Sequence, residues 1–269
     1  MSNLAVVVDP DARGRLVLKP VPEPVPDRSE AIVRVRAISL NRGEVRRSMT
    51  AAAGWRPGWD LAGVIERAAA DGTGPKVGER VVGFLPEGAW AQRVAVPKNA
   101  LAELPEKVTF SQAATFPVAG LTALLALGKG GPLLGKRVLV TGATGGVGDF
   151  AVQLARLAGA HVTGLVRRAD QVPSVRQLGA HEVIVGDEVP KEPKYDLIVE
   201  SVGGRSAPRW RRCSAPVSAS RSASRPRPKS RSTRGSSSWP AARRSTASTS
   251  SPSSGTSPPR SGWGVWPTW

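Results

Sequence analysis

Three glycines at three-residue spacing are the first feature of the sequence that suggests chemistry. Gly142, Gly145 and Gly148 directly follow the apolar run RVLVT and directly precede the amphipathic run DFAVQLARLAG. Between a strand and a helix, such glycines permit a tight turn, a close approach of the backbone to a pyrophosphate, and close helix packing. The free N–H groups and the positive helix end then face the phosphates. The pattern predicts a dinucleotide site; the alternative is a loop whose glycines serve packing alone.

The residues that select the cofactor lie about 20 positions further on, at the end of the second strand. An acidic side chain there binds the ribose 2′-hydroxyl, whereas a basic side chain binds a 2′-phosphate. Arg167 and Arg168 occupy this place in GLVRRAD, and no acidic residue precedes them in that segment. Because a guanidinium can bind a phosphate through two hydrogen bonds, the pair favours NADPH. The alternative is two solvated surface arginines.

The elements that must hold this turn alternate between strand-like and helix-like runs from residue 136 onward. Strands are expected at KRVLVTG, HVTGLV, EVIV and KYDLIVES, with helices over GDFAVQLARLAG and near 170–178. Strands joined by crossover helices form a parallel α/β sheet. The spacing in the first of these helices predicts one sheet-packing face, formed by Phe150, Leu154, Ala155 and Leu157.

The first hundred residues have a different pattern, with short apolar strands separated by glycine and proline. These strands are expected at 31–40, 60–66, 78–85 and 89–97. Closely spaced strands predict a small barrel-like β domain. A helix over about 111–127, capped by Ser111, is expected next, with a domain boundary near 115–130.

Six segments in the same order carry a family resemblance. They are RAISLNRGEV (36–45), GWDLAGVI (58–65), GAWAQRVAVP (88–97), FPVAGLTALLAL (116–127), LVTGATGGVGDFAVQLARLAGAHV (139–162) and YDLIVESVGG (195–204). Together they resemble the medium-chain dehydrogenase/reductase superfamily, in particular its zinc-free, NADPH-dependent quinone oxidoreductase branch, which includes zeta-crystallin. The resemblance implies an α/β protein with a GroES-like catalytic domain over 1–115 and an incomplete, NADPH-binding Rossmann domain over 116–204. The active site would lie in the cleft between them.

Zinc-containing relatives bind a catalytic metal through a Cys after the second strand and a His in a GHE motif, and zinc needs such ligands. Here Asn41 lies where the Cys is expected, Trp59 replaces the His, and residues 1–160 contain no Cys or His. His161 and His181 lie beside strands of the α/β domain, where a structural role is the simplest reading. No zinc site of the family type is expected.

Without a metal, the resemblance implies hydride transfer from NADPH to an electron-poor acceptor, a quinone or an α,β-unsaturated carbonyl. Asn41 and Thr122 are the candidates for hydrogen bonds to the developing oxyanion. Their alternatives are a turn residue and a helix-packing residue. Trp55, Trp59 and Trp90 either line an aromatic substrate pocket or belong to the core, which is the commoner outcome.

The resemblance also implies which residues contact NADPH. They are Gly142, Ala143, Thr144, Gly145, Gly146, Val147, Gly148, Arg167, Arg168, Ser201 and Val202.

The last 65 residues differ in composition from the rest of the chain. The 269-residue chain has 38 basic and 21 acidic residues, a formal charge of +17. Residues 205–269 hold 13 of the basic residues and no acidic ones, so residues 1–204 carry only +4. The tail has 19 Ser, 9 Pro and 5 of the 8 Trp, but no Leu, Ile, Phe, Tyr or Met. Such a composition predicts a disordered segment that contributes no strand.

Codon arithmetic suggests that this tail is read out of frame. Trp always has the codon TGG, and Cys always has TGY. If Arg is encoded by CGN and Ser by TCN, reading the gene one base earlier across Arg209 to Ser214 yields the pattern of an amphipathic helix. Continued through 216–224, the shift supplies a strand-like run with glycines. The alternative is a genuine Arg/Ser-rich tail that binds RNA or another polyanion, with tryptophans stacking on bases.

The remaining inferences concern compartment and partners. The N-terminus lacks a secretory signal, the longest apolar stretch at 118–128 is half a membrane span, and Cys213 is the lone cysteine. We therefore expect a cytoplasmic protein with a small-molecule partner and no membrane partner; nucleic acid is a less favoured partner. Without later strands the parallel sheet would keep an uncovered edge, so weak cofactor binding, low activity and loss of the family-type homodimer are expected.

Overall fold

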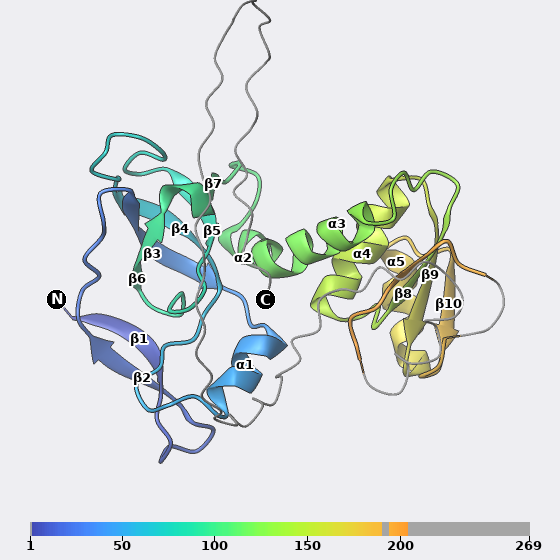
Figure 1. The fold of residues 1–269 in the computed structure, drawn as a ribbon, viewed down its shortest axis with the longest axis horizontal. Coiled ribbons are helices and arrows are strands. Elements are labelled where there is room, and N and C mark those ends of the chain that lie inside the picture. The colour runs from blue at the N-terminus through green and yellow to red at the C-terminus, as the bar shows by residue number, and fades with distance from the viewer. Residues whose placement is uncertain (1, 190–193, 204–269) are drawn as a thin grey trace, which may run out of the picture. The chain divides into compact units, whose positions relative to one another are not determined.

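The computed structural model describes residues 2–189 and 194–203. The predicted disorder of residues 205–269, their frame and their nucleic-acid alternative therefore lie outside the described residues. The β-rich half and the parallel sheet follow each other along the chain, in blue to green and in yellow to orange (Figure 1).

The N-terminal half contains a five-stranded antiparallel sheet in the order β6-β3-β4-β5-β7. Its strands are β3 (Glu30–Ile38), β4 (Asp60–Arg67), β5 (Arg80–Phe84), β6 (Arg93–Pro97) and β7 (Leu101–Glu103). Alternate side chains point inward along them, and Val33, Leu61, Ile65, Val81 and Val96 are at most 1% exposed. Four of these strands match predicted ones, so the expected β domain is present.

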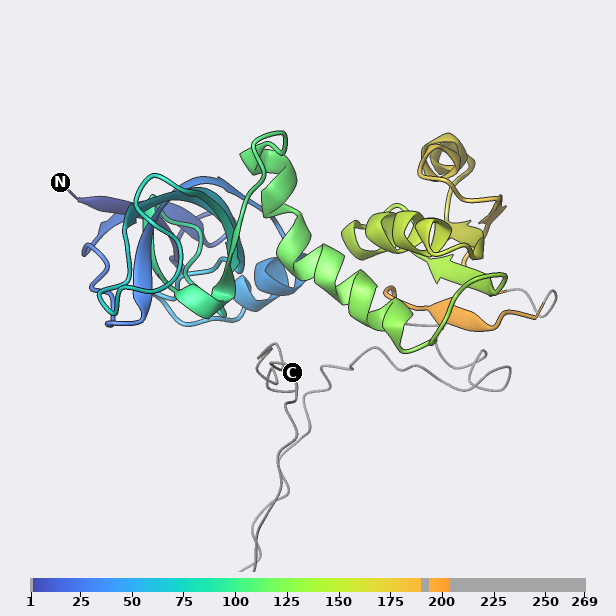
Figure 2. The same cartoon turned by 90° about the horizontal axis from the view of Figure 1, so that it is seen from above.

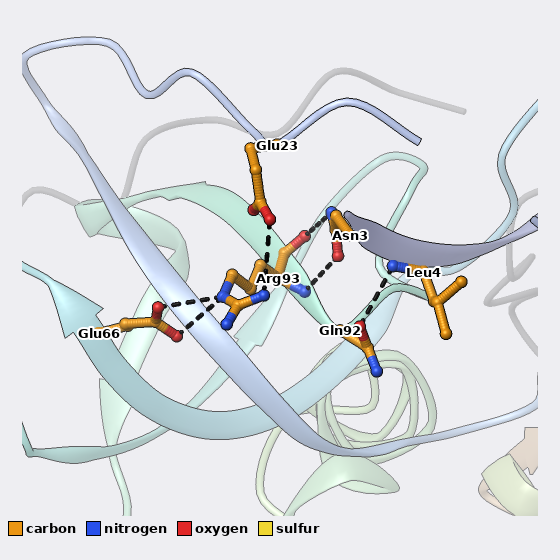
Figure 3. A network of polar contacts seen from close by, with 6 residues as sticks. All are labelled: Asn3, Leu4, Glu23, Glu66, Gln92 and Arg93. Carbon is orange, nitrogen blue, oxygen red and sulfur yellow. Dashed lines mark hydrogen bonds and ion pairs between the residues drawn. The ribbon is translucent and has the colours of Figure 1, made fainter. Parts of the chain in front are cut away.

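An N-terminal hairpin that the sequence analysis did not predict pairs β1 (Asn3–Val8) with β2 (Leu16–Val21). Figure 3 shows how its first residue is attached to β6: Asn3 Nδ2 donates to the Arg93 carbonyl at 2.9 Å, and Arg93 N donates to Asn3 Oδ1 at 3.0 Å. The Arg93 guanidinium also contacts Glu66 at 3.0 Å and Glu23 at 3.6 Å. One arginine thus joins three stretches of chain.

A short helix, α1 (Arg42–Ser48), follows β3. The side chain of Glu44, in the first turn of this helix, is fully buried and accepts a hydrogen bond from Asn41 N at 3.0 Å. This bond is one half of a capping box, the arrangement in which the third helical residue satisfies the backbone N–H of the cap. The helix therefore starts where an asparagine and a glutamate stand three residues apart.

The single helix expected over 111–127 is three consecutive pieces, seen as one green helical segment in Figure 2. They are α2 (Phe110–Ala114), the π-helical turn η2 (Phe116–Gly120) and α3 (Leu121–Gly128). The cap is Thr109, not Ser111: Thr109 Oγ1 accepts from Gln112 N at 3.2 Å. The interruption coincides with Pro117, which lacks the N–H that a regular helix requires.

The second half contains a parallel sheet in the order β10-β9-β8-β11. Its elements are β8 (Arg137–Thr141), α4 (Gly146–Leu157), β9 (His161–Val166), η3 (Ala169–Gln171), α5 (Val172–Gln177), β10 (Glu182–Val185) and β11 (Leu197–Val199). The α/β prediction is confirmed.

Helix α4 packs on this sheet through small side chains. Ala151, Val152 and Ala155 are fully buried against Val138 and Val162 of the strands. Phe150 and Leu154 pack partly against the same cluster, as predicted. Leu157, placed on that face by the spacing, is instead 83% exposed, because it is the last helical residue.

Candidate functional site

The glycine turn joins β8 to α4 with the conformation that its sequence predicted. Gly142 has a φ of 57°, in the left-handed region that side chains disfavour. Its carbonyl accepts a hydrogen bond from Gly145 N at 2.8 Å. A Cβ on Gly148 would lie 2.2 Å from that same carbonyl oxygen. The first and third glycines are therefore required by the fold itself.

The N-terminus of α4 begins directly after Gly145 and offers backbone N–H groups. Because the first N–H groups of a helix have no acceptor within it, those of Gly146, Val147 and Gly148 are available to an anion. Gly145 and Gly146 are exposed, and so is Thr144, whose Oγ1 accepts from Gln171 Nε2 at 3.1 Å. This is the geometry of a phosphate-binding turn.

Ala143 and Asp149 flank this turn. Ala143 is fully buried and its N–H donates to the Leu165 carbonyl at 3.3 Å, so it anchors the turn rather than lining it. Asp149 lies in the first turn of α4 and accepts from Gln153 Nε2 at 3.0 Å. Burial raises the pKa of Asp149 above its ordinary value. Asp149 was not predicted as part of the site, although its position next to Gly148 is visible in the sequence.

The end of β11 lies beside the turn. Ser201 Oγ donates to the Thr141 carbonyl at 3.3 Å, and Ser201 N donates to Thr141 Oγ1 at 3.3 Å. A Cβ on Gly142 would be 2.7 Å from a methyl of Val202. The structure thus brings two residues from the end of the described chain onto the glycine turn, 60 positions away.

The two arginines follow the end of β9 at Val166, and both are exposed. Arg168 is paired with an acidic residue that comes after it: its Nε lies 3.0 Å from Asp170 Oδ1. The hydrogen bond to Arg168 lowers the pKa of Asp170. Arg167 has no salt bridge within the described residues. Of the two, Arg167 is therefore the freer cation.

Asn41 lies at a turn, as one of its two interpretations predicted, and its side chain is held by a buried carboxyl group. It precedes α1 as the cap, and its Nδ2 donates to Asp60 Oδ2 at 2.6 Å. Asp60 and Glu44 are fully buried acidic residues, and burial raises the pKa of each. Sequence reasoning missed this carboxyl pair. The spacing of Asn41 and Glu44 carries a capping-box signal, but nothing local indicates Asp60.

Thr122 lies in the first turn of α3 and is exposed, so it is not a core-packing residue. Within the described residues no hydrogen bond joins it to Asn41.

The tryptophans divide between core and surface. Trp90 is 5% exposed and donates from Nε1 to the Ser39 carbonyl at 3.1 Å, so it belongs to the core. Trp55 is half-buried, donates to Glu87 at 2.8 Å and lies under the Arg47 guanidinium. Trp59 is half-buried beside Gly43.

Residues 2–189 and 194–203 contain no cluster of three or more His, Cys, Asp or Glu that could hold a metal ion. Each helix in this part of the chain is too short or too polar to span a bilayer.

Comparison with known proteins identifies relatives of the same type. Residues 27–106 match the alcohol dehydrogenase GroES-like domain. The chloroplast envelope quinone oxidoreductase homolog of Arabidopsis thaliana is 34% identical over 207 residues, 68% of this chain and 63% of that protein. The chain therefore spans less than two thirds of the length of this curated relative.

Solved structures are similar over the same region. The quinone oxidoreductase of Coxiella burnetii is 25% identical, with a TM-score of 0.68 over 76% of this chain and 70% of that one. The quinone oxidoreductase of Thermus thermophilus, whose structures include a complex with NADPH, is 34% identical, with a TM-score of 0.59 over 67% and 59% of the two chains. In its β domain, its parallel sheet and its glycine turn, the chain is similar to quinone oxidoreductases of the medium-chain dehydrogenase/reductase superfamily.

Proposed function

We propose that this protein is an oxidoreductase that binds NADPH at the Gly142–Gly148 turn and transfers its hydride to a quinone or an α,β-unsaturated carbonyl. The observation that carries the proposal is the turn: a left-handed Gly142, a close contact at Gly148 and an exposed helix start between them. The named activity of the relatives supports the substrate class. NADPH would supply the hydride, and the protein would supply binding and orientation.

Most of the predicted site residues take a direct role in this proposal. The N–H groups at Gly146–Gly148 would bind the pyrophosphate, with Gly145 leaving room for it. Arg167, and Arg168 when released from Asp170, would bind the 2′-phosphate. Ser201 and Val202 would contact the cofactor from the end of β11. Asn41 and Thr122 would donate hydrogen bonds to the oxygen on which negative charge develops.

We further propose that the reaction needs no zinc. The support is chemical: Asn41 and Trp59 stand where the resemblance expects Cys and His ligands, and an amide and an indole are poor zinc ligands. Addition of a chelator should leave turnover unchanged, and metal analysis should find no stoichiometric zinc. One bound zinc per chain would overturn this part of the proposal.

The domain ranges 1–115 and 116–204, the cytoplasmic location and the loss of a homodimer remain predictions. Some relatives are described as chloroplastic or mitochondrial.

Weak cofactor binding and low turnover are the final elements of the proposal. We expect low activity because residues 205–269 contain no Leu, Ile, Phe, Tyr or Met from which further strands of the sheet could be built. Replacing the tail by its alternative frame after Gly204 should raise both cofactor affinity and quinone reduction.

The deciding experiment is a fluorescence titration of the chain with NADPH and NADH, followed by a quinone-reduction assay at high protein concentration. We expect tighter binding of NADPH and NADPH-dependent reduction. Equal affinities would contradict the cofactor assignment. Strong binding and fast turnover by the chain as it stands would contradict the expected impairment and the frame interpretation.

A further inference from the structure

A buried carboxyl group at the start of β4 contacts both halves of the proposed catalytic machinery. Asp60 is fully buried. Its Oδ2 accepts from Asn41 Nδ2 at 2.6 Å, and its Oδ1 accepts from Val118 N at 2.8 Å. The two donors lie 19 and 58 residues away in the sequence. Both oxygens of one side chain are therefore used to join segments that no local structure would bring together.

The second of these donors belongs to the helical segment that carries Thr122. Val118 lies inside η2, and α3 follows η2 without a break at Leu121. A π-helical turn leaves backbone groups outside the regular ladder, so an external acceptor for Val118 N fixes this turn in place. The position of Thr122, four residues later, depends on that anchor.

The first donor, Asn41, is held both at its backbone and at its side chain. Glu44 Oε2 accepts from Asn41 N, while Glu44 Oε1 accepts from Trp59 N at 2.8 Å. Glu44 therefore fixes the backbone at residue 41, and Asp60 fixes the side-chain amide. An amide can present either its oxygen or its NH2 group to a neighbour, but a carboxylate only accepts. Asp60 thereby determines which end of the amide faces β4.

We propose that Asp60 is the positioning residue of this active site: it orients the Asn41 amide and anchors the helix start that carries Thr122. The inference rests on the proposed function and adds a residue to it. Fixing the NH2 group toward Asp60 leaves the second N–H of Asn41 in one defined direction, available as the oxyanion donor. Such preorganised donors contribute because they need no reorientation during the reaction.

Asp60→Asn is the informative substitution, because it keeps the size of the side chain. The new amide would have one acceptor oxygen in place of two and would add a donor. Because Asn41 and Val118 donate to different oxygens of Asp60, the new NH2 group would face one of these two donors, and that bond should be lost. Asp196→Asn is the matched control: Asp196 accepts from Arg137 N at 2.8 Å in the parallel sheet, remote from residue 41 in the sequence.

Nuclear magnetic resonance can observe the amide directly, since the chain has three asparagines, Asn3, Asn41 and Asn99. With ¹⁵N-asparagine, the full-length parent should give nuclear Overhauser effects between the Asn41 NH2 protons and the β protons of Asp60. Asp60→Asn should shift the Asn41 pair and leave that of Asn3, which donates to Arg93, in place. Asp196→Asn should move neither pair.

Kinetics separates positioning from mere stability. In NADPH-dependent quinone reduction, Asp60→Asn should lower kcat about tenfold to a hundredfold with little change in KM. In an Asn41→Ala background the same substitution should have a smaller effect, because the part of its role that acts through the amide is already lost and only the anchor at Val118 remains.

Four outcomes decide between the possibilities. Parent spectra without the Asn41–Asp60 contacts overturn the inference even if Asp60→Asn does not fold. An unchanged kcat in a folded Asp60→Asn variant overturns it while the proposed function stands. Additive losses in the double variant also overturn it. A parent with the contacts but without turnover contradicts the proposed function and supports the placement of the amide.

Discussion

The glycine turn and the carboxyl cluster of Asn41, Glu44 and Asp60 are fixed by opposite means. The turn consists almost entirely of backbone: its geometry follows from a positive φ at Gly142 and from a missing Cβ at Gly148. The cluster consists of side chains, two of them carboxyl groups without exposure to solvent, held by N–H donors from three segments. A steric clash should therefore disrupt the glycine turn, and loss of a hydrogen-bond acceptor should disrupt the carboxyl cluster.

The largest effect is expected at the turn. Gly148→Ala would place a Cβ 2.2 Å from the Gly142 carbonyl oxygen and 2.8 Å from the Ala143 Cα, both backbone atoms that cannot move aside cheaply. We expect a loss of about 3 kcal/mol in the free energy of unfolding, together with loss of NADPH binding. Urea denaturation measures the first and fluorescence titration the second.

Gly128→Ala is the control for that substitution. Gly128 lies in α3 and a Cβ there would have no atom within 4 Å. Its stability should stay the same or rise slightly, since alanine favours helix. Equal losses in both variants would mean that the close contact at the turn does not limit the fold.

A smaller loss is expected in the carboxyl cluster. Glu44→Ala removes the acceptor of two backbone N–H groups, those of Asn41 and Trp59, and leaves a cavity beside a buried strand end. We expect a loss of about 2 kcal/mol, measured by urea denaturation. The exposed Glu106, changed to Ala, should change stability little. A Glu44 variant as stable as that control would show that water replaces the lost acceptor.

The arginines should affect cofactor choice rather than stability. Replacing Arg167 and Arg168 together by Ala should weaken NADPH binding about tenfold and leave NADH binding almost unchanged. Asp170→Asn should have the opposite effect and raise the affinity for NADPH modestly, because it frees the Arg168 guanidinium. Titrations with both cofactors test this, and a preference that survives the double substitution would place the 2′-phosphate elsewhere.

The smallest effect concerns pH. His181 Nδ1 accepts from Val162 N at 2.9 Å, and its ring stacks on His161 at 4.3 Å. Burial first, then Arg156 and His161, lower the pKa of His181 below its ordinary 6.5. The unfolded chain then binds more protons just below pH 6.5, so stability should fall as the pH drops through that value.

Thermal unfolding between about pH 7.5 and 5 measures this fall. His181→Gln keeps an acceptor for Val162 N but does not titrate, so its midpoint should fall less steeply with decreasing pH. An identical slope in the parent and the variant would assign the acid sensitivity to other groups.

The same contrast explains how much could be predicted. The glycine turn and the parallel sheet were predicted because a strand, three glycines and an amphipathic helix are consecutive in the sequence. Asp60 was not predicted because its importance comes from donors 19 and 58 residues away. The break at η2 was missed because the apolar spacing continues through it, although Pro117 is its visible signal. The ion pair between Arg168 and Asp170 was not predicted because only the residues before Arg168 were considered, and Asp170 comes after it.

The attachment of β1 through Asn3 has a practical consequence for handling the protein. The side chain of Asn3 takes the place of a backbone pairing partner for Arg93, and Leu4 and Val6 continue the contact through hydrogen bonds to the backbone of Gln92 and Trp90. Removal of the first six residues, by a protease or by a later start site, would therefore break the attachment of β1 at the edge of the β domain. A shortened gene that starts at Val7 should therefore yield insoluble protein.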